Sequence, residues 1–428
     1  MRAWILLGLI TFVFAKHEHY IGWKTFHVRP SNDVQLKTFG SLIQQLDLDV
    51  LGHATTQREG LVLVQPDQLE AFTSLMDGQG IAYRIHADDI KSKLDYDDML
   101  IEEAHNATKA RNGARLPYDN YQTWEAIEAY LDDVARRFPN RATLVNAGQS
   151  FEGRNLKYLK ISSTNFEDKS KPVIVIDGGI HAREWISPPT VTWAIRKLVE
   201  DVTEPDLLDR FDWILFPVVN PDGYRFTFTN NRFWRKTRST DQSALGSICP
   251  GVDGNRNYDF FWNTVGTSSN ACADTFAGRR AFSEVEVRAV RDILHEHLPR
   301  IALYLTMHSF GSMILYPWGH DGSLSNNALG LHTVGIAMAD AINSKALSHF
   351  PRYVVGNSVL VIGYAASGAS EDYAHSIGVP FSYTYELPGL NSGMQGFVLE
   401  PRYIQQVCEE TWLGIVAGAR RAGDIFRK

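Results

Sequence analysis

A histidine and a glutamate stand three residues apart in His181-Ala-Arg-Glu184, directly after the apolar run 172–180. In a tight turn that follows a buried strand, an imidazole and a carboxylate at this spacing can converge on one point. Catalytic zinc is typically held by three protein groups with a fourth position open to water, and two histidines with one glutamate form a known set. His308 follows the apolar run 303–307 and fits as the third ligand. A short His/Glu pair is a weak signal by itself, because most such pairs are surface turns.

The length and composition of the chain are those of an ordinary globular protein. Its 428 residues exceed what one hydrophobic core usually serves, so we expect two folding units. Apolar residues make up 44% of the chain, and 17 residues are prolines. The formal net charge is −7 and no basic tract is present that could meet phosphates, which excludes nucleic acid as a partner.

The first 15 residues predict export from the cell. They carry an early Arg2, an apolar core over residues 4–10 and small residues at the positions that a signal peptidase reads. The apolar run is too short to span a bilayer, and no other stretch reaches about 20 apolar residues, which disfavours a membrane anchor. We therefore expect a signal peptide at 1–15 and a secreted, extracellular protein.

Three cysteines in an exported chain imply one disulfide and one unpaired thiol. Cys249 and Cys272 enclose a loop rich in Gly, Ser, Asn and Asp, and a loop of this kind gains from a covalent link. Cys408 falls inside a helical pattern, so we expect it to be a buried thiol. The predicted disulfide is Cys249–Cys272.

Residues 16–90 form a series of short segments that predicts a small α+β unit. The expected elements are an extended segment over 19–28, a helix over 34–46, a strand over 60–64, a helix over 65–77 and a strand over 81–86. The unit contains no cysteine, and its histidines lack the spacing of metal ligands. Nothing in it looks catalytic.

Residues 91–115 are rich in charge and alanine, which predicts an exposed helix that frays into a linker. Exposed basic residues at Arg111 and Arg115 are natural cleavage points for a trypsin-like protease. Asn106-Ala-Thr108 also matches a glycosylation acceptor, which requires exposure. We interpret residues 16–90 as a removable prodomain; the alternative is a permanent accessory domain.

Residues 116–428 alternate strands with long helices, which predicts a three-layer α/β catalytic domain with a mixed central β-sheet flanked by helices. Strands are expected over 156–161, 173–176, 213–219, 301–307 and 381–387. Helices are expected over 124–137, 189–200, 284–297 and 329–344, with a last helix from Pro401 toward Arg421. Ser283 and Glu286 would form a capping box. His181 and His308 both fall at strand ends, where sites lie in open α/β sheets.

Several motifs in one order make the chain resemble the secreted pancreatic-type zinc metallocarboxypeptidases of the A/B family in their proenzyme form. The resemblance covers nearly all 428 residues. The motifs that carry it are His181-Ala-Arg-Glu-Trp185, Asn231-Arg-Phe-Trp-Arg-Lys-Thr-Arg238, Gly251-Val-Asp-Gly-Asn-Arg-Asn257, His308-Ser309, Tyr364-Ala-Ala-Ser-Gly368 and Tyr383-Thr-Tyr-Glu-Leu387.

The resemblance implies a peptidase that carries one Zn²⁺ per chain and removes residues from the C-termini of peptides and proteins. Its zinc ligands would be His181, Glu184 and His308. Glu386 would be the general base, because a carboxylate must take the proton of the attacking water. Asp253 would orient His181 through the second ring nitrogen of the imidazole.

The resemblance also assigns the groups that recognise a chain end. Arg235 would stabilise the oxyanion, a charge that forms only in the transition state. Asn255 and Arg256 would bind the terminal carboxylate, since a guanidinium matches a carboxylate bidentately. Tyr364 would donate from a mobile loop to the same carboxylate, and Arg183 would help to bind residues upstream of the cleaved bond.

Two positions depart from the usual family pattern. Phe310 follows Ser309 where many relatives carry Tyr, which should affect a secondary subsite and leave the chemistry intact. Glu371 occupies the position that governs side-chain preference, where A-type members have an apolar residue and B-type members an Asp. A carboxylate at the pocket floor favours C-terminal Lys and Arg. Val359 and Gly363 are expected nearby, where they would leave room for the longer Glu side chain.

Three other functions are alternatives to this one. Glu371 could turn aside to a salt bridge and leave an apolar pocket with A-type preference for aromatic or aliphatic ends. A non-catalytic homologue would be expected to lose Glu386 or a zinc ligand, and none is lost. A zinc amidase for small acylated amino acids would not need the prodomain or the clamp at Asn255 and Arg256. We therefore expect a monomeric proenzyme that a trypsin-like protease activates.

Overall fold

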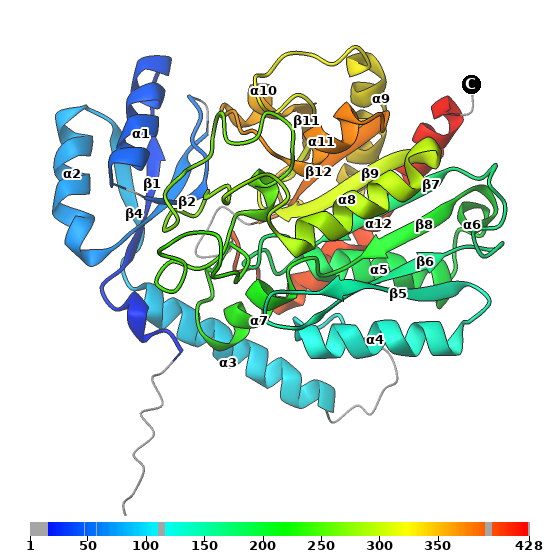
Figure 1. The fold of residues 1–428 in the computed structure, drawn as a ribbon. Helices are drawn as coiled ribbons and strands as arrows, with labels where there is room; N and C mark the ends of the chain where they lie inside the picture. The colour runs from blue at the N-terminus through cyan, green and yellow to red at the C-terminus, as the bar shows by residue number, and fades with distance from the viewer. Residues whose placement is uncertain (1–15, 47, 57, 110–115, 390–395, 427–428) are drawn as a thin grey trace, which may run out of the picture.

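The protein contains two sheets, each with helices packed against it, and a long helix between them in the sequence (Figure 1). The computed structural model describes residues 16–46, 48–56, 58–109, 116–389 and 396–426. The expected signal peptide at 1–15 and the expected cleavage points Arg111 and Arg115 lie outside the described residues. Asn106 is in a helix, but its side chain also lies outside the described part.

The N-terminal sheet is antiparallel, with strand order β2-β3-β1-β4. Its elements are the 3-10 helix Glu18–Tyr20, β1 (Lys24–Arg29), α1 (Asp33–Leu46), β2 (Asp49–Gly52), β3 (Gly60–Val64), the 3-10 helix Pro66–Gln68, α2 (Leu69–Gly78) and β4 (Ala82–Ala87). One face of the sheet packs Phe26 and Val62 against Phe39, Phe72 and Met76 of the two helices. The predicted α+β unit is therefore present, although β2 was missed and the extended segment begins only at Lys24.

The helix that follows, α3 (Ile90–Lys109), is more buried than the sequence suggested. Ile90, Leu94 and Ile101 are buried, and Ile101 joins the core of the larger unit. Residues spaced by three or four lie on one helix face, so a narrow apolar stripe runs along a helix that also carries many charged side chains. The expectation of an exposed helix was wrong for this stripe.

The central sheet has eight strands in the order β11-β10-β12-β9-β7-β8-β6-β5. Its strands are β5 (Ala142–Gln149), β6 (Asn155–Ile161), β7 (Val173–Gly178), β8 (Asp212–Phe216), β9 (Ile301–Ser309), β10 (Met313–Tyr316), β11 (Val354–Asn357) and β12 (Phe381–Leu387). The middle strands β12, β9, β7 and β8 are parallel, and β6 and β5 pair antiparallel to their neighbours. At the other edge β10 is antiparallel to β12 and parallel to β11. The predicted mixed sheet is therefore confirmed.

Helices cover both faces of this sheet and complete the three layers (Figure 1). The longer helices are α4 (Trp124–Arg137), α5 (Ser187–Val199), α8 (Val285–His297), α9 (Ala328–Asn343) and α12 (Ile404–Phe426). The shorter ones are α6 (Asp206–Arg210), α7 (Pro221–Thr229), α10 (Ser358–Ile362), α11 (Ser370–Ser376) and the 3-10 helices Gly254–Arg256, Leu298–Arg300 and Pro401–Tyr403. Helices α4, α5, α9 and α12 share one core, while α8 and α11 pack on the opposite face.

The predicted capping box at the start of α8 does not form. Glu284 is the N-cap residue and makes no side-chain cap bond. The hydroxyl of Ser283 donates instead to Glu284 Oε1 and accepts from the amide of Asn257. Buried hydrogen-bond partners from the neighbouring loop have displaced the local capping pattern.

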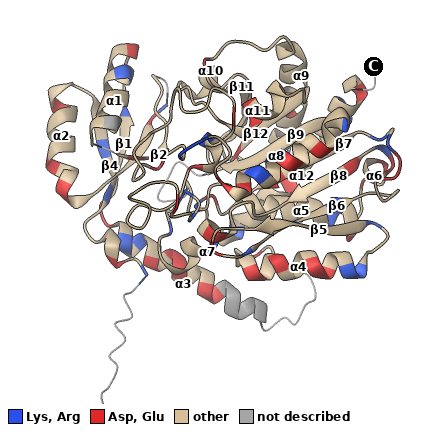
Figure 2. Cartoon of the chain, viewed as in Figure 1, with Lys and Arg blue, Asp and Glu red and all other residues tan. Residues whose placement is uncertain are grey.

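Lys and Arg are interspersed with Asp and Glu along α3, α4 and α8 (Figure 2). Such mixing matches the absence of a basic tract in the sequence. Among the described residues, no helix is both long enough and apolar enough to cross a membrane.

Candidate active site

Three buried side chains that could hold a metal ion meet at one edge of the central sheet. His181 and Glu184 lie in the loop between β7 and α5, and His308 is the second-last residue of β9, the strand beside β7. Gly179 takes a φ of 68° there, a conformation that glycine adopts without strain, and turns the chain toward the edge. His181 Nδ1 lies 2.7 Å from Glu184 Oε1, and His308 Nδ1 lies 3.0 Å from both His181 Nδ1 and Glu184 Oε2.

This cluster fits a zinc ion in composition and geometry. One ligand atom from each residue lies within 4.8 Å of the other two, and all three side chains are buried. Among the residues that the structure describes, no other group of His, Cys, Asp and Glu meets this condition. Burial opposes the charge of Glu184, but His181 and His308 hold its pKa below the usual value. The site therefore presents an ionised carboxylate between two imidazoles, the donor set of many catalytic zinc sites.

Asp253 contacts both His181 and Arg235. The contact with His181 is the one that the sequence analysis predicted. Its Oδ1 lies 2.9 Å from His181 Nε2, and its Oδ2 accepts from Arg235 Nε at 3.0 Å. Asp253 is fully buried; burial alone would raise its pKa, but Arg235 and His181 hold the pKa well below its usual range. The carboxylate thus fixes the imidazole so that Nδ1 faces the other two ligands. Arg235 Nη1 reaches to 3.9 Å from Glu184.

His308 has a polar support that the sequence analysis missed. Its Nε2 lies 3.3 Å from the hydroxyl of Thr306, which donates to Asp177 Oδ1 at 2.7 Å. The phenol of Tyr304 donates to the other oxygen of Asp177 at 2.6 Å. Burial raises the pKa of Asp177 to about 6. The polar residues of two adjacent buried strands therefore orient the second histidine.

Glu386 stands next to the ligands. It lies on β12, which runs parallel to β9, and it pairs in register with His308. Burial, followed by the negative charge of Glu184, raises its pKa to about 8. A divalent cation among the ligands would favour the ionised form. The strand therefore presents a carboxylate that can accept a proton near neutral pH.

Asn255, Arg256 and Tyr364 are the residues expected to bind the terminal carboxylate of a substrate. Asn255 and Arg256 lie on one loop, and Tyr364 lies on the turn opposite it. Asn255 Oδ1 accepts from the backbone N–H of Ser370 at 2.8 Å, which leaves its amide nitrogen for other partners. Arg256 donates from Nε to the carbonyl of Gly266 at 2.9 Å, and the phenol of Tyr364 donates to the same carbonyl at 2.8 Å. All three side chains line the cavity that also contains the zinc ligands.

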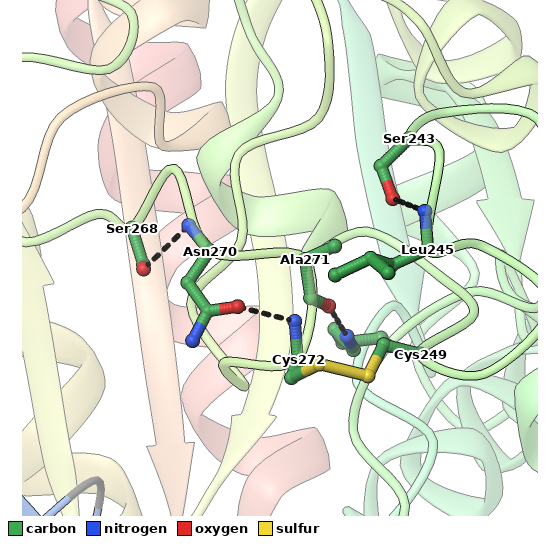
Figure 3. Close-up of a disulfide and its surroundings, with 8 residues drawn as sticks. Ser243, Leu245, Cys249, Ser268, Asn270, Ala271 and Cys272 are labelled. Carbon is green, nitrogen blue, oxygen red and sulfur yellow. Dashed lines mark hydrogen bonds between the residues drawn. A yellow bond between two sulfur atoms is a disulfide. The ribbon is translucent and has the colours of Figure 1, made fainter.

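A disulfide between Cys249 and Cys272 closes this loop, as predicted (Figure 3). The amide N–H of Cys272 donates to Asn270 at 3.0 Å, and the carbonyl of Ala271 accepts from the ammonium of Lys236 at 2.7 Å. The bridge holds together the two ends of a segment that carries Asp253, Asn255 and Arg256. Cys408 is buried and unpaired, also as predicted.

Glu371 lies in the wall of the same cavity, on the first turn of α11. Its side chain is 5% exposed, and Oε2 has no hydrogen-bond partner among the described residues. Burial, followed by the adjacent Asp372, raises the pKa of Glu371 to about 7. A substrate cation would therefore find an unpaired carboxylate here.

Val359 and Gly363 do not line the cavity with it, contrary to the sequence expectation; Ser358 and Ile362 do. Positions 358 and 362 are one turn apart on α10, so their side chains lie on the same face of the helix. The side chain of Val359 points about 100° away from that face. Val359 packs toward Gly322 instead. Gly363 ends α10 with a left-handed φ of 78° and faces Thr55 of the N-terminal unit.

The N-terminal unit covers the cavity. Asp49 on β2 accepts from Arg183 at 3.0 Å, and Arg183 also contacts Asp274 at 3.1 Å. The loop after β2 stacks His53 on Tyr364, with ring centroids 4.6 Å apart and planes 15° apart. Arg58 of the same loop lies 3.4 Å from Met313, the residue that pairs with Glu386 across the sheet. In this form the loop occupies the cavity that a substrate would enter.

Ser309 and Phe310 line the same cavity. The Ser309 backbone N–H donates to Glu184 Oε2 at 3.2 Å, and its hydroxyl has no partner among the described residues. The ring of Phe310 packs edge-on against Phe397 with centroids 5.1 Å apart. A Cβ at Gly52 would lie 3.6 Å from this ring, so β2 passes directly over the subsite.

Comparisons with known proteins agree with this geometry. Residues 127–414 match the family described as zinc carboxypeptidase, and residues 26–97 match the family described as carboxypeptidase activation peptide. The chain is 66% identical to carboxypeptidase B of Helicoverpa zea over 429 residues, covering all of both proteins, and 35% identical to carboxypeptidase B of Bos taurus over 97% of each. The crystal structure of carboxypeptidase A from Helicoverpa armigera superimposes with a TM-score of 0.92 at 44% identity, covering 96% of this chain and all of that one. The chain therefore belongs to the zinc carboxypeptidase family and carries an activation peptide on the N-terminal side of the catalytic unit.

Proposed function

We propose that the mature enzyme hydrolyses the last peptide bond of peptides that end in Lys or Arg. The observation that carries this preference is the buried carboxylate of Glu371 in the wall of the active-site cavity, whose Oε2 has no hydrogen-bond partner among the described residues. A buried charge without a partner is unfavourable, so a Lys or Arg side chain that reaches it restores the pairing. The names of the relatives do not decide the question, because they include both A and B types.

The reaction divides among the residues around the metal ligands. Zinc held by His181, Glu184 and His308 would polarise the peptide carbonyl and lower the pKa of a water molecule. Glu386 takes the proton of that water and delivers it to the leaving amine. Arg235, held by Asp253 at 3.0 Å, stabilises the negative charge that develops on the carbonyl oxygen.

The same cavity recognises the chain end. Asn255 and Arg256 bind the terminal carboxylate, and Tyr364 adds its phenol once His53 no longer stacks on it. Arg183 and Phe310 contact residues upstream of the cleaved bond after Asp49 and β2 have left. An exopeptidase needs this arrangement, because the clamp and the base together fix the distance from the chain end to the reacting bond.

A-type preference is the alternative. It requires Glu371 to turn aside into a salt bridge and leave an apolar pocket. Among the described residues, no Lys, Arg or His nitrogen lies within 4.0 Å of the Glu371 carboxylate. This observation supports the B-type proposal.

The test compares peptides that differ only in the last residue, Lys, Arg, Phe or Leu. Wild-type enzyme should prefer Lys and Arg in kcat/KM by at least about tenfold, the low end of what a close charge pair contributes. Glu371→Ile should reverse that order and favour Leu or Phe. If the wild type already prefers Phe or Leu and Glu371→Ile leaves the order unchanged, the B-type proposal fails.

The proposal also includes latency and export. The unit from residue 16 to about residue 115 keeps the secreted, monomeric proenzyme inactive until a trypsin-like protease cuts near Arg111 or Arg115. The contacts of Asp49, His53 and Arg58 inside the cavity support this role. Trypsin treatment should release activity, and an intact chain that is already as active as the trimmed one would show that the N-terminal unit is only an accessory.

A further inference from the structure

Asp372, the neighbour of Glu371, is a fully buried carboxylate that the proposed mechanism does not use. Both of its oxygens accept from the backbone N–H of Gly319 at 2.9 Å, and Oδ2 also accepts from the N–H of His320 at 3.1 Å. These donors are uncharged. The carboxylate of Asp372 therefore holds the turn at 319–320 in place. Among the described residues, no Lys or Arg side chain forms an ion pair with it.

The fastened turn forms the wall of the pocket beside Glu371. A Cβ built on Gly319 would lie 3.5 Å from Glu371 Oε1 and 3.6 Å from Asp372 Oδ2. Gly319 thus separates the two carboxylates by a strip of backbone that carries no side chain. Because the Gly319 carbonyl accepts from the N–H of Ala366 at 2.8 Å, the wall is also tied to the loop of Tyr364.

Other charged groups face the pair from several elements. Arg256, His308 and Glu386 interact electrostatically with Glu371 from the cavity side. His320 lies beside Asp372 with Nδ1 3.5 Å from Oδ2, and the hydrogen bond to Asp372 raises the pKa of His320. Arg256 would be engaged by the carboxylate of a substrate. The net charge left for the substrate side chain is then negative.

We propose that Asp372 is a further specificity-determining residue, which positions the pocket wall and adds a second negative charge behind Glu371. The pocket then selects a cationic side chain by the joint charge of both carboxylates, although only Glu371 touches it. Asp372 acts through Glu371 and the turn, so it is a positioning residue. The inference rests on the proposed role of Glu371.

The experiment uses trypsin-activated enzyme and two peptides that end in Lys or in norleucine, which differ only by the ammonium group. The quantity measured is the ratio of their kcat/KM values at pH 9, where Glu371 is ionised. Asp372→Asn keeps the size and most hydrogen bonds of the side chain. It should lower the Lys/norleucine ratio by at least about fivefold, mostly through KM for the Lys peptide, because a charge a few ångströms behind the first one is weakly screened.

A second readout separates charge from mere structure. Asp372 is a cause of the raised pKa of Glu371, so Asp372→Asn should move the pH at which Lys selectivity appears to a lower value. Asp321→Asn is the matched control, since Asp321 is an exposed neighbour of the same His320 and should leave the ratio unchanged. Equal losses for both peptides, or an unchanged ratio, would overturn the inference.

Two further variants complete the design. Glu371→Gln tests the underlying proposal. If this variant keeps the wild-type Lys/norleucine ratio, the proposed role of Glu371 is wrong. If the ratio falls in Glu371→Gln but not in Asp372→Asn, only the proposed role of Asp372 is refuted. If Asp372→Asn does not fold, His320→Gln replaces it. Removing the imidazole that offsets Asp372 should move the pH at which Lys selectivity appears to a higher value, opposite to the shift in Asp372→Asn. An unchanged pH dependence would equally contradict the proposal.

Discussion

Glu386 lies directly beside His308, as in-register partners on the parallel strands β12 and β9. Side chains at paired positions of adjacent strands point to the same face of a sheet. The carboxylate and the imidazole are therefore held side by side by main-chain hydrogen bonds and do not depend on a mobile loop. The main chain holds each of the two residues in place independently of the other side chain. The carboxylate and the imidazole can therefore be removed separately by substitution.

Glu386→Gln should retain zinc but lose at least about a hundredfold in kcat, which is the low end of what a general base contributes. His308→Ala should instead lose the metal, since it removes one of three ligands. Metal content of the purified proteins and turnover of a Lys-terminated peptide measure both effects. Glu409→Gln, an exposed glutamate on α12, is the matched control and should behave as wild type. Turnover by Glu386→Gln close to that of wild type would contradict the assignment of the base.

Thr306→Val should weaken zinc binding by about tenfold, the low end of the effect of outer ligand supports. The substitution keeps the shape of the side chain but removes the hydroxyl between His308 Nε2 and Asp177. Competition with a chelator measures the affinity. Thr333→Val, at a half-buried position of α9 away from the site, is the control. An unchanged affinity would show that β9 alone orients the imidazole.

Cys249→Ser with Cys272→Ser should lower the free energy of unfolding by on the order of 3 kcal/mol, as expected for a closed loop of about 20 residues. The same change should raise KM, because the opened loop carries the carboxylate-binding Asn255 and Arg256. Thermal unfolding and steady-state kinetics measure the two effects. Peptide mapping without reduction provides the control: a bridge that includes Cys408 would refute the pairing.

The strands that carry the site could be predicted because each is a continuous apolar run that ends in a polar residue of chemical use. β12 begins and ends where the sequence pattern placed it, and β9 extends two residues further to include His308. Strands β10 and β11 have four residues each, which is too short for a periodic signal. The support of His308 was missed because Asp177 and Thr306 were counted as parts of apolar runs. A polar residue in a strand buried on both faces must find a partner, and that rule was the available signal.

Contacts between the two units could not be predicted, because no local pattern records which surfaces dock. Asp49, His53 and Arg58 lie in or beside a strand that the sequence did not reveal. Their roles follow only from the position of β2 over the cavity. The buried face of α3 was hidden for a different reason: Leu94 and Ile101 are seven residues apart, and the charged residues between them dominate the composition.

His53 makes latency depend on pH. Packing against the enzyme, followed by the charges of Arg256 and Arg235, lowers the pKa of His53 to about 3, whereas an exposed histidine titrates near 6.5. The docked state therefore binds the proton less well than the open state. His53 therefore supports docking most strongly above pH 6.5, and its contribution weakens as the pH falls from about 6.5 toward 3, by up to about tenfold for each pH unit.

The measurement is the activity of the intact proenzyme divided by that of the trypsin-activated enzyme at each pH, since this ratio cancels the pH dependence of catalysis itself. Between pH 7.5 and pH 5.5 the ratio should rise about tenfold more in wild type than in His53→Gln, because only the wild type gains the imidazolium charge. Asp49 opposes the effect of His53 in both proteins, because its burial beside Arg183 raises its pKa to about 7 and lets the docked state bind a proton there. The comparison with His53→Gln cancels this shared contribution. His349→Gln, on the exposed surface of the catalytic unit, is the control and should keep the full rise. The same pH dependence of the ratio in wild type and in His53→Gln would show that the stacked imidazole does not control the opening of the cavity.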